Sequence, residues 1–239
     1  MKRMLIDYLP MALAAAMIIT FAVWKEQTFF KTLPTLITLA VQLLNVRVNR
    51  YAFLLGGINA VIYGIVYLTE GLYFSMISAL ALSAPIQLYA FINWGKNRTS
   101  NAKNELRFLS LKQRIWVIGI ILCGWGICYF GLSGLFATAR MPLPDTLIFS
   151  IGITVSVLAA MRYVDSQYIN ICSCTISIIM WSIICASEPE NINYLIISFY
   201  NTFMIIKASV SWTRSLKKNT RFLEREAISM PTASCKELQ

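Results

Sequence analysis

The chain has 239 residues, of which 57% are hydrophobic and only 13% are charged, and its net charge is +10. A soluble domain usually has about 25% charged residues, and this deficit excludes an ordinary soluble protein, which needs charged surface to stay dispersed. The positive charge does not indicate nucleic-acid binding, because the basic residues lie in short loops between apolar stretches rather than along one face.

The apolar stretches recur along the whole chain at about 20 residues each, the length that crosses roughly 30 Å of hydrocarbon. They predict an all-α integral membrane protein with eight transmembrane helices, at residues 5–24, 28–46, 51–69, 72–94, 115–137, 144–163, 167–186 and 191–212. No small-residue cleavage site ends the first stretch cleanly, so we expect it to be retained as a helix.

The basic residues predict the orientation of these helices. Of the 21 Lys and Arg residues, Lys25, Lys31 and Arg140 fall in loops on one side of the membrane, and Lys207 lies inside the last stretch. All the others fall at the two termini or in loops on the opposite side. Because positive loops stay in the cytoplasm, we expect a multi-pass protein of the cell (inner) membrane with both termini cytoplasmic.

The residues that usually hold metals or cofactors are sparse. There is no His, and five of the six cysteines lie inside apolar stretches, where cysteine behaves as a small hydrophobe. The sequence therefore predicts no metal site, no disulfide framework and no cofactor. It also lacks clustered carboxylates and a Ser–base pair, which argues against a membrane enzyme acting on lipid, and it has no phosphate-binding loop for ATP.

Two stretches share a layout. In the first, Tyr51 begins a helix, an acidic turn follows, and a second helix ends 43 residues later at Trp94; in the second, Tyr168 and Trp212 are 44 residues apart. The pattern predicts two parallel three-helix repeats joined by one linker helix, a 3+1+3 arrangement with an added N-terminal helix. The predicted segments are 1–27 (N-terminal helix), 28–94 (first repeat), 95–143 (cytoplasmic linker and connecting helix), 144–213 (second repeat) and 214–239 (cytoplasmic tail).

Transporters often place their solute between such repeats near mid-membrane, so polar and aromatic residues within the helices are the candidate site. Polar side chains in membrane helices face the protein interior, where they can be satisfied. The candidate substrate-binding residues are Asn59, Tyr63, Gln87, Trp94, Tyr168, Thr175, Tyr200, Asn201 and Lys207.

Each candidate also has a structural interpretation. The tryptophans can anchor helices at the membrane surface, the amides can bond between helices, and the tyrosines can be packing residues. Lys207 can extend its amine to the cytoplasmic boundary; if it faced the solute instead, it would disfavour a cation such as thiamine.

The runs Leu55-Gly-Gly-Ile-Asn-Ala-Val-Ile-Tyr63 and Pro85-Ile-Gln-Leu-Tyr-Ala-Phe-Ile-Asn-Trp94-Gly-Lys-Asn97, with Tyr200, Ala208 and Trp212 in the second half, resemble the PnuC family of vitamin transporters. The resemblance covers roughly residues 30–216. It implies the full-length SWEET-like 3+1+3 fold, a homotrimer, and facilitated diffusion of a nucleoside-like vitamin, most often nicotinamide riboside. It also implies that a cytoplasmic vitamin kinase makes uptake effectively one-way.

The chain departs from that family at the start of the seventh helix. Nicotinamide-riboside members have a Glu-Gln-Trp-x-x-Trp run followed by an Asn, whereas this chain has Ser166-Gln167-Tyr168-Ile-Asn-Ile171 and Thr175. An aromatic clamp is weakened, so a thiamine or riboflavin transporter of the same fold is an alternative. A non-transporting membrane scaffold or sensor is a third hypothesis.

Overall fold

The computed structural model describes residues 2–96, 106–132, 134 and 139–229, and this part of the chain is helical, with a single isolated bridge between Arg107 and Tyr163. The elements are α1 (Lys2–Trp24), α2 (Phe29–Val46), α3 (Tyr51–Thr69), α4 (Tyr73–Ile77), η1 (Ser78–Ser83), α5 (Ala84–Lys96), α6 (Leu111–Gly126), η2 (Ile127–Leu132), α7 (Pro142–Ala160), α8 (Asp165–Ser187), η4 (Pro189–Asn191) and α9 (Ile192–Ser229). Most of the linker (97–105) and the end of the tail (230–239) lie outside the described residues, and with them Arg98, Lys103, Pro231 and Cys235.

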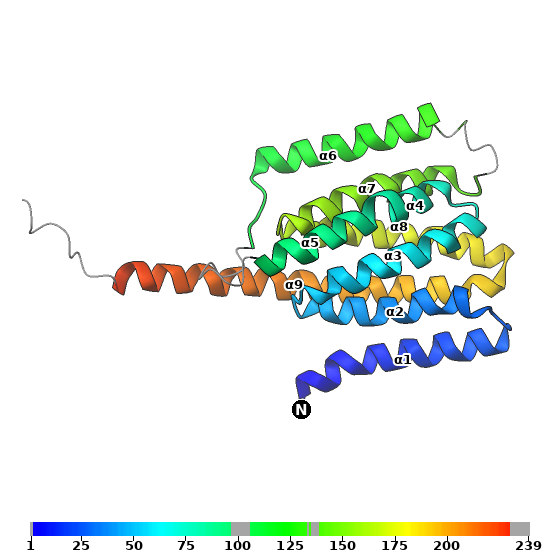
Figure 1. Cartoon of the computed structure of the whole chain (residues 1–239), viewed down its shortest axis with the longest axis horizontal. Helices are drawn as coiled ribbons and strands as arrows, with labels where there is room; N and C mark the ends of the chain where they lie inside the picture. Colours follow the sequence, from blue (N-terminus) through cyan, green and yellow to red (C-terminus); the bar gives the residue numbers. More distant parts are fainter. Residues whose placement is uncertain (1, 97–105, 133, 135–138, 230–239) are drawn as a thin grey trace, which may run out of the picture.

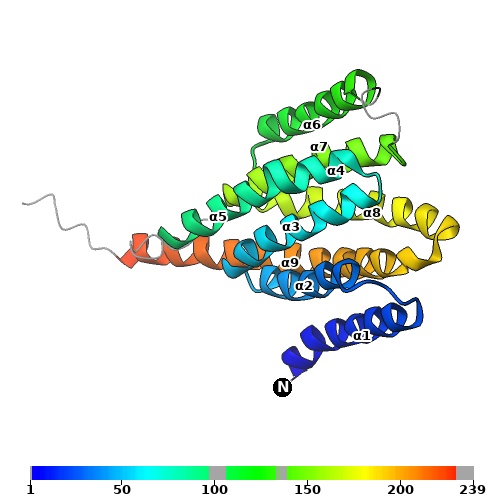
Figure 2. The ribbon, with the colours of Figure 1, turned by 45° about the vertical axis from the view of Figure 1, so that its right-hand side comes forward.

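The helices lie side by side along one direction (Figures 1 and 2). By length and composition, 7 helical segments of the described chain can cross a membrane, and α1 contributes a shorter apolar stretch, Tyr8–Trp24. The prediction of an all-α membrane protein is therefore confirmed.

Contacts between helices close a ring. α2 packs on α3, α3 on α5, α5 on α7, α7 on α8, α8 on α9, and α9 returns to α2. The first helix and the predicted linker helix lie outside this ring, α1 against α2 and α9, and α6 against α7 (Figure 1). Each half of the chain contributes three consecutive spans to this ring, α2 to α5 from the first half and α7 to α9 from the second.

The two halves also share a turn. The helices α2 and α7 both end two residues before a residue in the left-handed backbone region, Val48 at φ 54° and Arg162 at φ 67°. In each turn that residue donates its amide to the carbonyl three residues before it, from Val48 to Asn45 and from Arg162 to Ala159. This correspondence supports the predicted repeat, although the 3+1+3 division stays a prediction.

The fifth span begins earlier than its hydropathy suggested. Ser110 accepts a hydrogen bond from the backbone of Gln113, and the Gln113 side chain accepts one from the backbone of Ser110, which is a capping box. Such a box satisfies the open amides of a first helical turn, so α6 starts at Leu111 rather than near residue 115.

The prediction that the last helix ends near Trp212 is wrong, because α9 continues through Ser229 and projects beyond the bundle (Figure 1). The segment 214–229 is rich in Lys, Arg, Leu and Glu, which are good helix formers. Its charge marks the end of the membrane span but does not mark the end of the helix.

Candidate functional site

A cavity of about 260 Å³ lies inside the ring of helices, between α2, α3, the fourth span (α4, η1 and α5) and α7. Its lining is formed by Thr38, Val41, Gly56, Asn59, Ala60, Tyr63, Tyr67, Ser75, Ser78, Ala79, Ser83, Gln87, Ile148, Phe149 and Gly152. Among these described lining residues there are hydroxyls, amides and aromatic rings but no charged side chain. Such a wall can bind a polar solute with a ring, and it offers no cation to an anionic group.

Three of the predicted residues, Asn59, Tyr63 and Gln87, line this cavity. The Asn59 amide nitrogen donates to Thr38 Oγ1 at 2.8 Å, and the same Oγ1 lies 3.4 Å from the Tyr63 hydroxyl. Asn59 is 5% exposed, and its Oδ1 has no hydrogen-bond partner within the described structure. A buried acceptor left open is costly, so this oxygen can receive a donor from a solute.

Gly56 makes room for Gln87. A Cβ built on Gly56 would lie 2.0 Å from the Gln87 Oε1, closer than any real contact. The two residues sit on facing helices, α3 and α5, which pack on each other. A side chain larger than hydrogen at position 56 would therefore displace the Gln87 amide from its place in the cavity wall.

The π-helical segment η1 forms one wall. Its hydrogen bonds run from residue i to i+5, so residues five apart lie nearly above each other. Ser78 and Ser83 are five apart, and both line the cavity. In an α-helix, at about 100° per residue, they would point in clearly different directions, so the π segment adds a hydroxyl to the cavity.

Next to the cavity is a column of aromatic rings. Tyr67 stacks on Tyr63 with centroids 5.4 Å apart, Tyr63 lies 6.5 Å from Tyr194, and Tyr194 lies 4.5 Å from Trp181. The column links the first half of the chain to the second. It gives the solute an aromatic neighbour that does not depend on Tyr168.

An ionic cluster occupies the end of the bundle where α3 ends. We use this name for Lys31, Glu70, Arg140, Glu188 and Asn191. Glu70 Oε1 pairs with Lys31 Nζ at 2.8 Å, and its Oε2 lies 3.3 Å from Arg140 and 3.2 Å from the Asn191 amide. Arg140 reaches Glu188 at 2.8 Å. The cluster joins α2, α3, the segment before α7, and the turn between α8 and α9.

Hydrogen bonding by Arg140 is the main reason that the pKa of the Glu188 carboxyl lies below its ordinary value. Glu70 is the centre of the cluster, because its side chain is only 4% exposed while two cations and an amide contact it. Lys31 and Arg140, two of the three basic residues predicted on this side, are thus both paired with a carboxylate.

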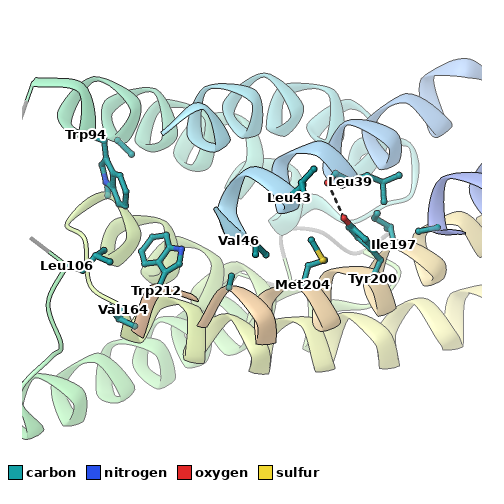
Figure 3. Close-up of a cluster of buried hydrophobic side chains, with 14 of the residues drawn as sticks. Leu39, Leu43, Val46, Trp94, Leu106, Val164, Ile197, Tyr200, Met204 and Trp212 are labelled. Atoms are coloured by element: carbon teal, nitrogen blue, oxygen red, sulfur yellow. Dashed lines mark hydrogen bonds between the residues drawn. The ribbon is translucent and has the colours of Figure 1, made fainter. Parts of the chain in front are cut away.

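The opposite end is held by a tryptophan cluster, defined as Phe53, Trp94, Arg162 and Trp212. The rings of Trp94 and Trp212 are 5.5 Å apart, and Phe53 lies 5.0 Å from Trp94 (the tryptophans are shown in Figure 3). The Arg162 guanidinium lies 5.7 Å from the Trp94 ring. Trp94 is 2% exposed, so it is a buried residue that joins the halves of the chain rather than an anchor at the lipid surface, and it does not line the cavity.

The remaining predicted residues also lie outside the cavity lining. Tyr200 is buried, and its hydroxyl donates to the Leu39 carbonyl at 3.2 Å (Figure 3). Asn201 is half-buried, and its amide oxygen has no partner among the described residues. Lys207 is half-buried with its amine 6.0 Å from the Phe203 ring.

Tyr168 and Thr175 lie on an exposed face of α8. The Tyr168 hydroxyl is 3.0 Å from Thr213 Oγ1, and the Thr175 hydroxyl donates to the Ile171 carbonyl. The seven-residue spacing correctly put them on one face, but that face points away from the cavity.

The sequence did not indicate several other residues of the cavity wall. Thr38, Tyr67, Ser75 and Ser78 were not singled out, because single hydroxyls in membrane helices commonly bond their own backbone. Asp145 was also not singled out, yet it is 1% exposed and accepts the backbone amides of Phe74 and Ser75 at 3.1 and 3.0 Å, as well as the Ser75 hydroxyl. Its carboxylate thereby holds the first turn of α4 against α7.

Comparison with known proteins now places the chain. The model of the nicotinamide mononucleotide transporter family matches residues 28–214. The chain belongs to this family. It is therefore a PnuC-type membrane transporter and not an enzyme, and the family predicted from scattered sequence positions is confirmed.

The fold agrees with this assignment. The crystal structure of the vitamin B3 transporter PnuC superposes with a TM-score of 0.75 and 16% sequence identity, over 89% of this chain and 92% of that one. A search of the curated proteins finds no match. At this identity the superposition establishes the PnuC fold, and the solute must be argued from the cavity.

Proposed function

We propose that this PnuC-type transporter moves a nucleoside-like vitamin without a phosphate group by facilitated diffusion, with nicotinamide riboside as the first candidate. The observation that carries the proposal is the lining of the cavity, which offers hydroxyls, amides and stacked tyrosines and has no cation among its described residues. A phosphate group taken from water needs a cationic partner, usually Arg or Lys. The lining therefore supports a nucleoside rather than the mononucleotide after which the family is named.

The volume of the cavity also favours a nucleoside-like solute. The cavity volume of about 260 Å³ lies just below the roughly 300–1,000 Å³ typical of small-molecule pockets. It suits a solute with one aromatic ring and a sugar better than the three-ring system of riboflavin. Since Lys207 does not line the cavity, it gives no reason to reject thiamine, which remains the alternative solute.

Facilitated diffusion is supported by the hydrogen bonds and ion pairs of the buried acids. Proton-coupled carriers hold a proton on a buried acid or His. Asp145 and Glu70, which are buried here, are fully engaged in holding α4 and the ionic cluster. We propose that access changes by rocking of two three-helix units, α2 to α5 and α7 to α9, about the cavity between them.

The cellular setting is part of the proposal. We place the chain in the cell (inner) membrane with both termini cytoplasmic, the tryptophan cluster inside and the ionic cluster outside. The resemblance to the PnuC family favours a homotrimer, and a cytoplasmic kinase that phosphorylates the solute would prevent its return. Labelling of single cysteines placed at positions 190 and 215 with a membrane-impermeant reagent in intact cells tests this orientation. We expect labelling of position 190 alone. Labelling of position 215 alone would show that the orientation is the opposite of the one proposed.

The transport test uses proteoliposomes with radiolabelled nicotinamide riboside, and unlabelled thiamine, riboflavin and nicotinamide mononucleotide as competitors. We expect equilibration without an ion gradient, and competition by nucleosides but not by the mononucleotide. Asn59→Leu should lower the flux by about tenfold or more, since the loss of a buried hydrogen bond to the solute costs about 1–3 kcal/mol and 1.4 kcal/mol corresponds to tenfold.

A matched pair of serines provides the control. Ser78 lines the cavity, while Ser182 is exposed on α8 and bonds its own helix. Ser78→Ala should weaken transport, and Ser182→Ala should leave it unchanged. Equal effects of both, or no accelerated flux of any of these vitamins, would show that the proposed solute class is wrong.

A further inference from the structure

A second cavity, of about 450 Å³, lies at the end of the bundle that holds the tryptophan cluster. It is a groove between the first turns of α6 and α8, and it is lined by Phe108, Leu109, Arg114, Val117, Ile118, Asp165, Tyr168 and Ile169. None of these residues lines the central cavity. The groove is separate from the proposed solute path.

The groove opens toward the hydrocarbon of the membrane. The helix α6 packs mainly on α7 and stands at the edge of the bundle (Figures 1 and 2), and none of its described residues is buried. Its Ile115, Trp116 and Ile118 are each more than half exposed. Since α6 crosses the membrane, these side chains contact acyl chains.

The inner part of the groove is apolar. Val117 and Ile169 pack against a buried cluster that includes Leu109, and Ile118 forms part of the same wall. An apolar gap of this size is a poor site for water, which requires two to four polar partners. Inside a bilayer the available apolar filler is a lipid tail.

The mouth of the groove carries a positioned cation. Arg114 Nε lies 2.9 Å from Asp165 Oδ1, and the other carboxylate oxygen accepts the Leu109 amide at 2.8 Å. This pair fixes the guanidinium at the rim with about half of the Arg114 side chain exposed. No hydrogen bond of its two terminal nitrogens to the described residues is observed, so they are available to a phosphate.

The surrounding charge favours an anion. Arg107, which stacks on Tyr163 at 4.3 Å, and Lys112 are exposed close to Arg114 in the chain. The carboxylate at this rim, Asp165, is already engaged. A cluster of cations at the end of a membrane helix attracts anionic lipid headgroups, and the flat guanidinium can bind two phosphate oxygens at once.

We propose that this groove is a binding site for one anionic phospholipid of the leaflet on the Arg114 side. One acyl chain lies between α6 and α8, and the phosphate is bound by Arg114. The lipid fills the space that α6 leaves beside α8 and thereby holds the linker helix to the rest of the bundle. The site is independent of which solute the protein carries.

Native mass spectrometry of the full-length protein in detergent tests the proposal, with phosphatidylglycerol and phosphatidylcholine of identical acyl chains as probes. We expect one phosphatidylglycerol per chain, bound about tenfold more tightly than phosphatidylcholine. Both lipids carry the phosphate, but the choline of phosphatidylcholine brings a further cation close to Arg107, Lys112 and Arg114. Val117→Trp, which fills the groove, should reduce binding about tenfold or more. Ile120→Trp, on the same helix but outside the groove lining, should not.

A second variant separates the contribution of the headgroup contact to lipid binding from that of the acyl chain. Arg114→Lys keeps a cation beside Asp165 but loses the fork that can bind two phosphate oxygens, so it should weaken the binding of both lipids without abolishing it. Equal binding of the two lipids to the unmodified protein, or unchanged binding in Val117→Trp, overturns the proposal. A Val117→Trp protein that dissociates into smaller oligomers while keeping its lipid would show the groove to be an interface between copies and would equally overturn it.

Discussion

The two ends of the bundle are closed by opposite chemistry. At one end, the cations of Lys31 and Arg140 and the amide of Asn191 converge on the buried carboxylate of Glu70. At the other end, the rings of Trp94 and Trp212 pack in a tilted arrangement. A buried ion pair is costly when one partner is lost, whereas an aromatic pair leaves no charge unpaired when it separates and can shift between offset-stacked and edge-to-face arrangements. The comparison suggests that the ionic end opens in an all-or-none manner and the aromatic end by graded repacking.

The largest effect is expected at the ionic end. Glu70→Gln leaves Lys31 and Arg140 without a buried anion, and breaking a buried pair in this way costs about 3–5 kcal/mol. Thermal unfolding of purified protein in detergent measures the loss. Glu190→Gln, an exposed acid near the same end, is the control and should change the midpoint little. Equal midpoints for Glu70→Gln and the control would remove the distinction between the two ends.

A smaller loss is expected at the aromatic end. Trp94→Leu removes a buried indole that contacts Phe53 and Trp212, and it leaves no carboxylate unpaired. We expect about 1–3 kcal/mol, below the roughly 3–5 kcal/mol of a Trp→Ala change in a core. Trp116→Leu, on the exposed face of α6, is the matched control. The idea of graded repacking fails if Trp94→Leu proves as destabilising as Glu70→Gln.

The strain in the turn that follows α2 is expected to appear as a difference between two variants. Val48 adopts φ 54°, where an L side chain costs about 1–2 kcal/mol, and its part-buried side chain also packs on the core. Val48→Ala and Val48→Gly both lose that packing, but only Val48→Gly relieves the strain. The unfolding midpoint of Val48→Gly should therefore lie above that of Val48→Ala, by an amount corresponding to about 0.5–1 kcal/mol once the greater freedom of glycine in the unfolded chain is subtracted. A lower midpoint for Val48→Gly than for Val48→Ala would contradict this account of the strain.

The smallest effect concerns acid. The pKa of the Glu188 carboxyl is lowered in the folded protein by Arg140. Its contribution to stability is complete above the ordinary value of 4.5 and is lost as the pH falls through the lowered value. In Glu188→Gln the unfolding midpoint should fall less steeply with acid than in the unmodified protein. Identical slopes would indicate that the exposed pair is screened by solvent.

The sequence predicted the fold better than it predicted the site. The number of helices and their membrane-spanning character followed from the lengths of the apolar stretches. The ends of most spans agree within a few residues, because hydropathy reports directly on lipid contact. The extension of α9 beyond Trp212 was missed, since leaving the membrane changes hydropathy without breaking backbone hydrogen bonds. The sequence pattern also indicated the family, through Gly56, Asn59, Gln87 and Trp94.

The candidate site was predicted in part, for a physical reason. Periodicity shows which residues share a helix face but not which way that face points, so Asn59, Tyr63 and Gln87 line the cavity while Tyr168 and Thr175 face outward. Buried ion pairs such as Glu70 with Arg140 join positions far apart in sequence, and a single sequence read alone gives no sign of such pairing. The π segment was equally invisible, because the residues Ser78–Ser83 are compatible with an ordinary α-helix.

That π segment holds one residue more than an α-helix of the same rotation would hold. The six residues of a wider π turn advance about as far around the helix axis as five α-helical residues at about 100° each. Removing one residue from 78–83 would therefore restore α-helical bonding and leave Gln87 facing the cavity, whereas Ser78 and Ser83 would no longer both face it. The extra residue thus adds a polar group to the solute path without changing the register of the helix that follows.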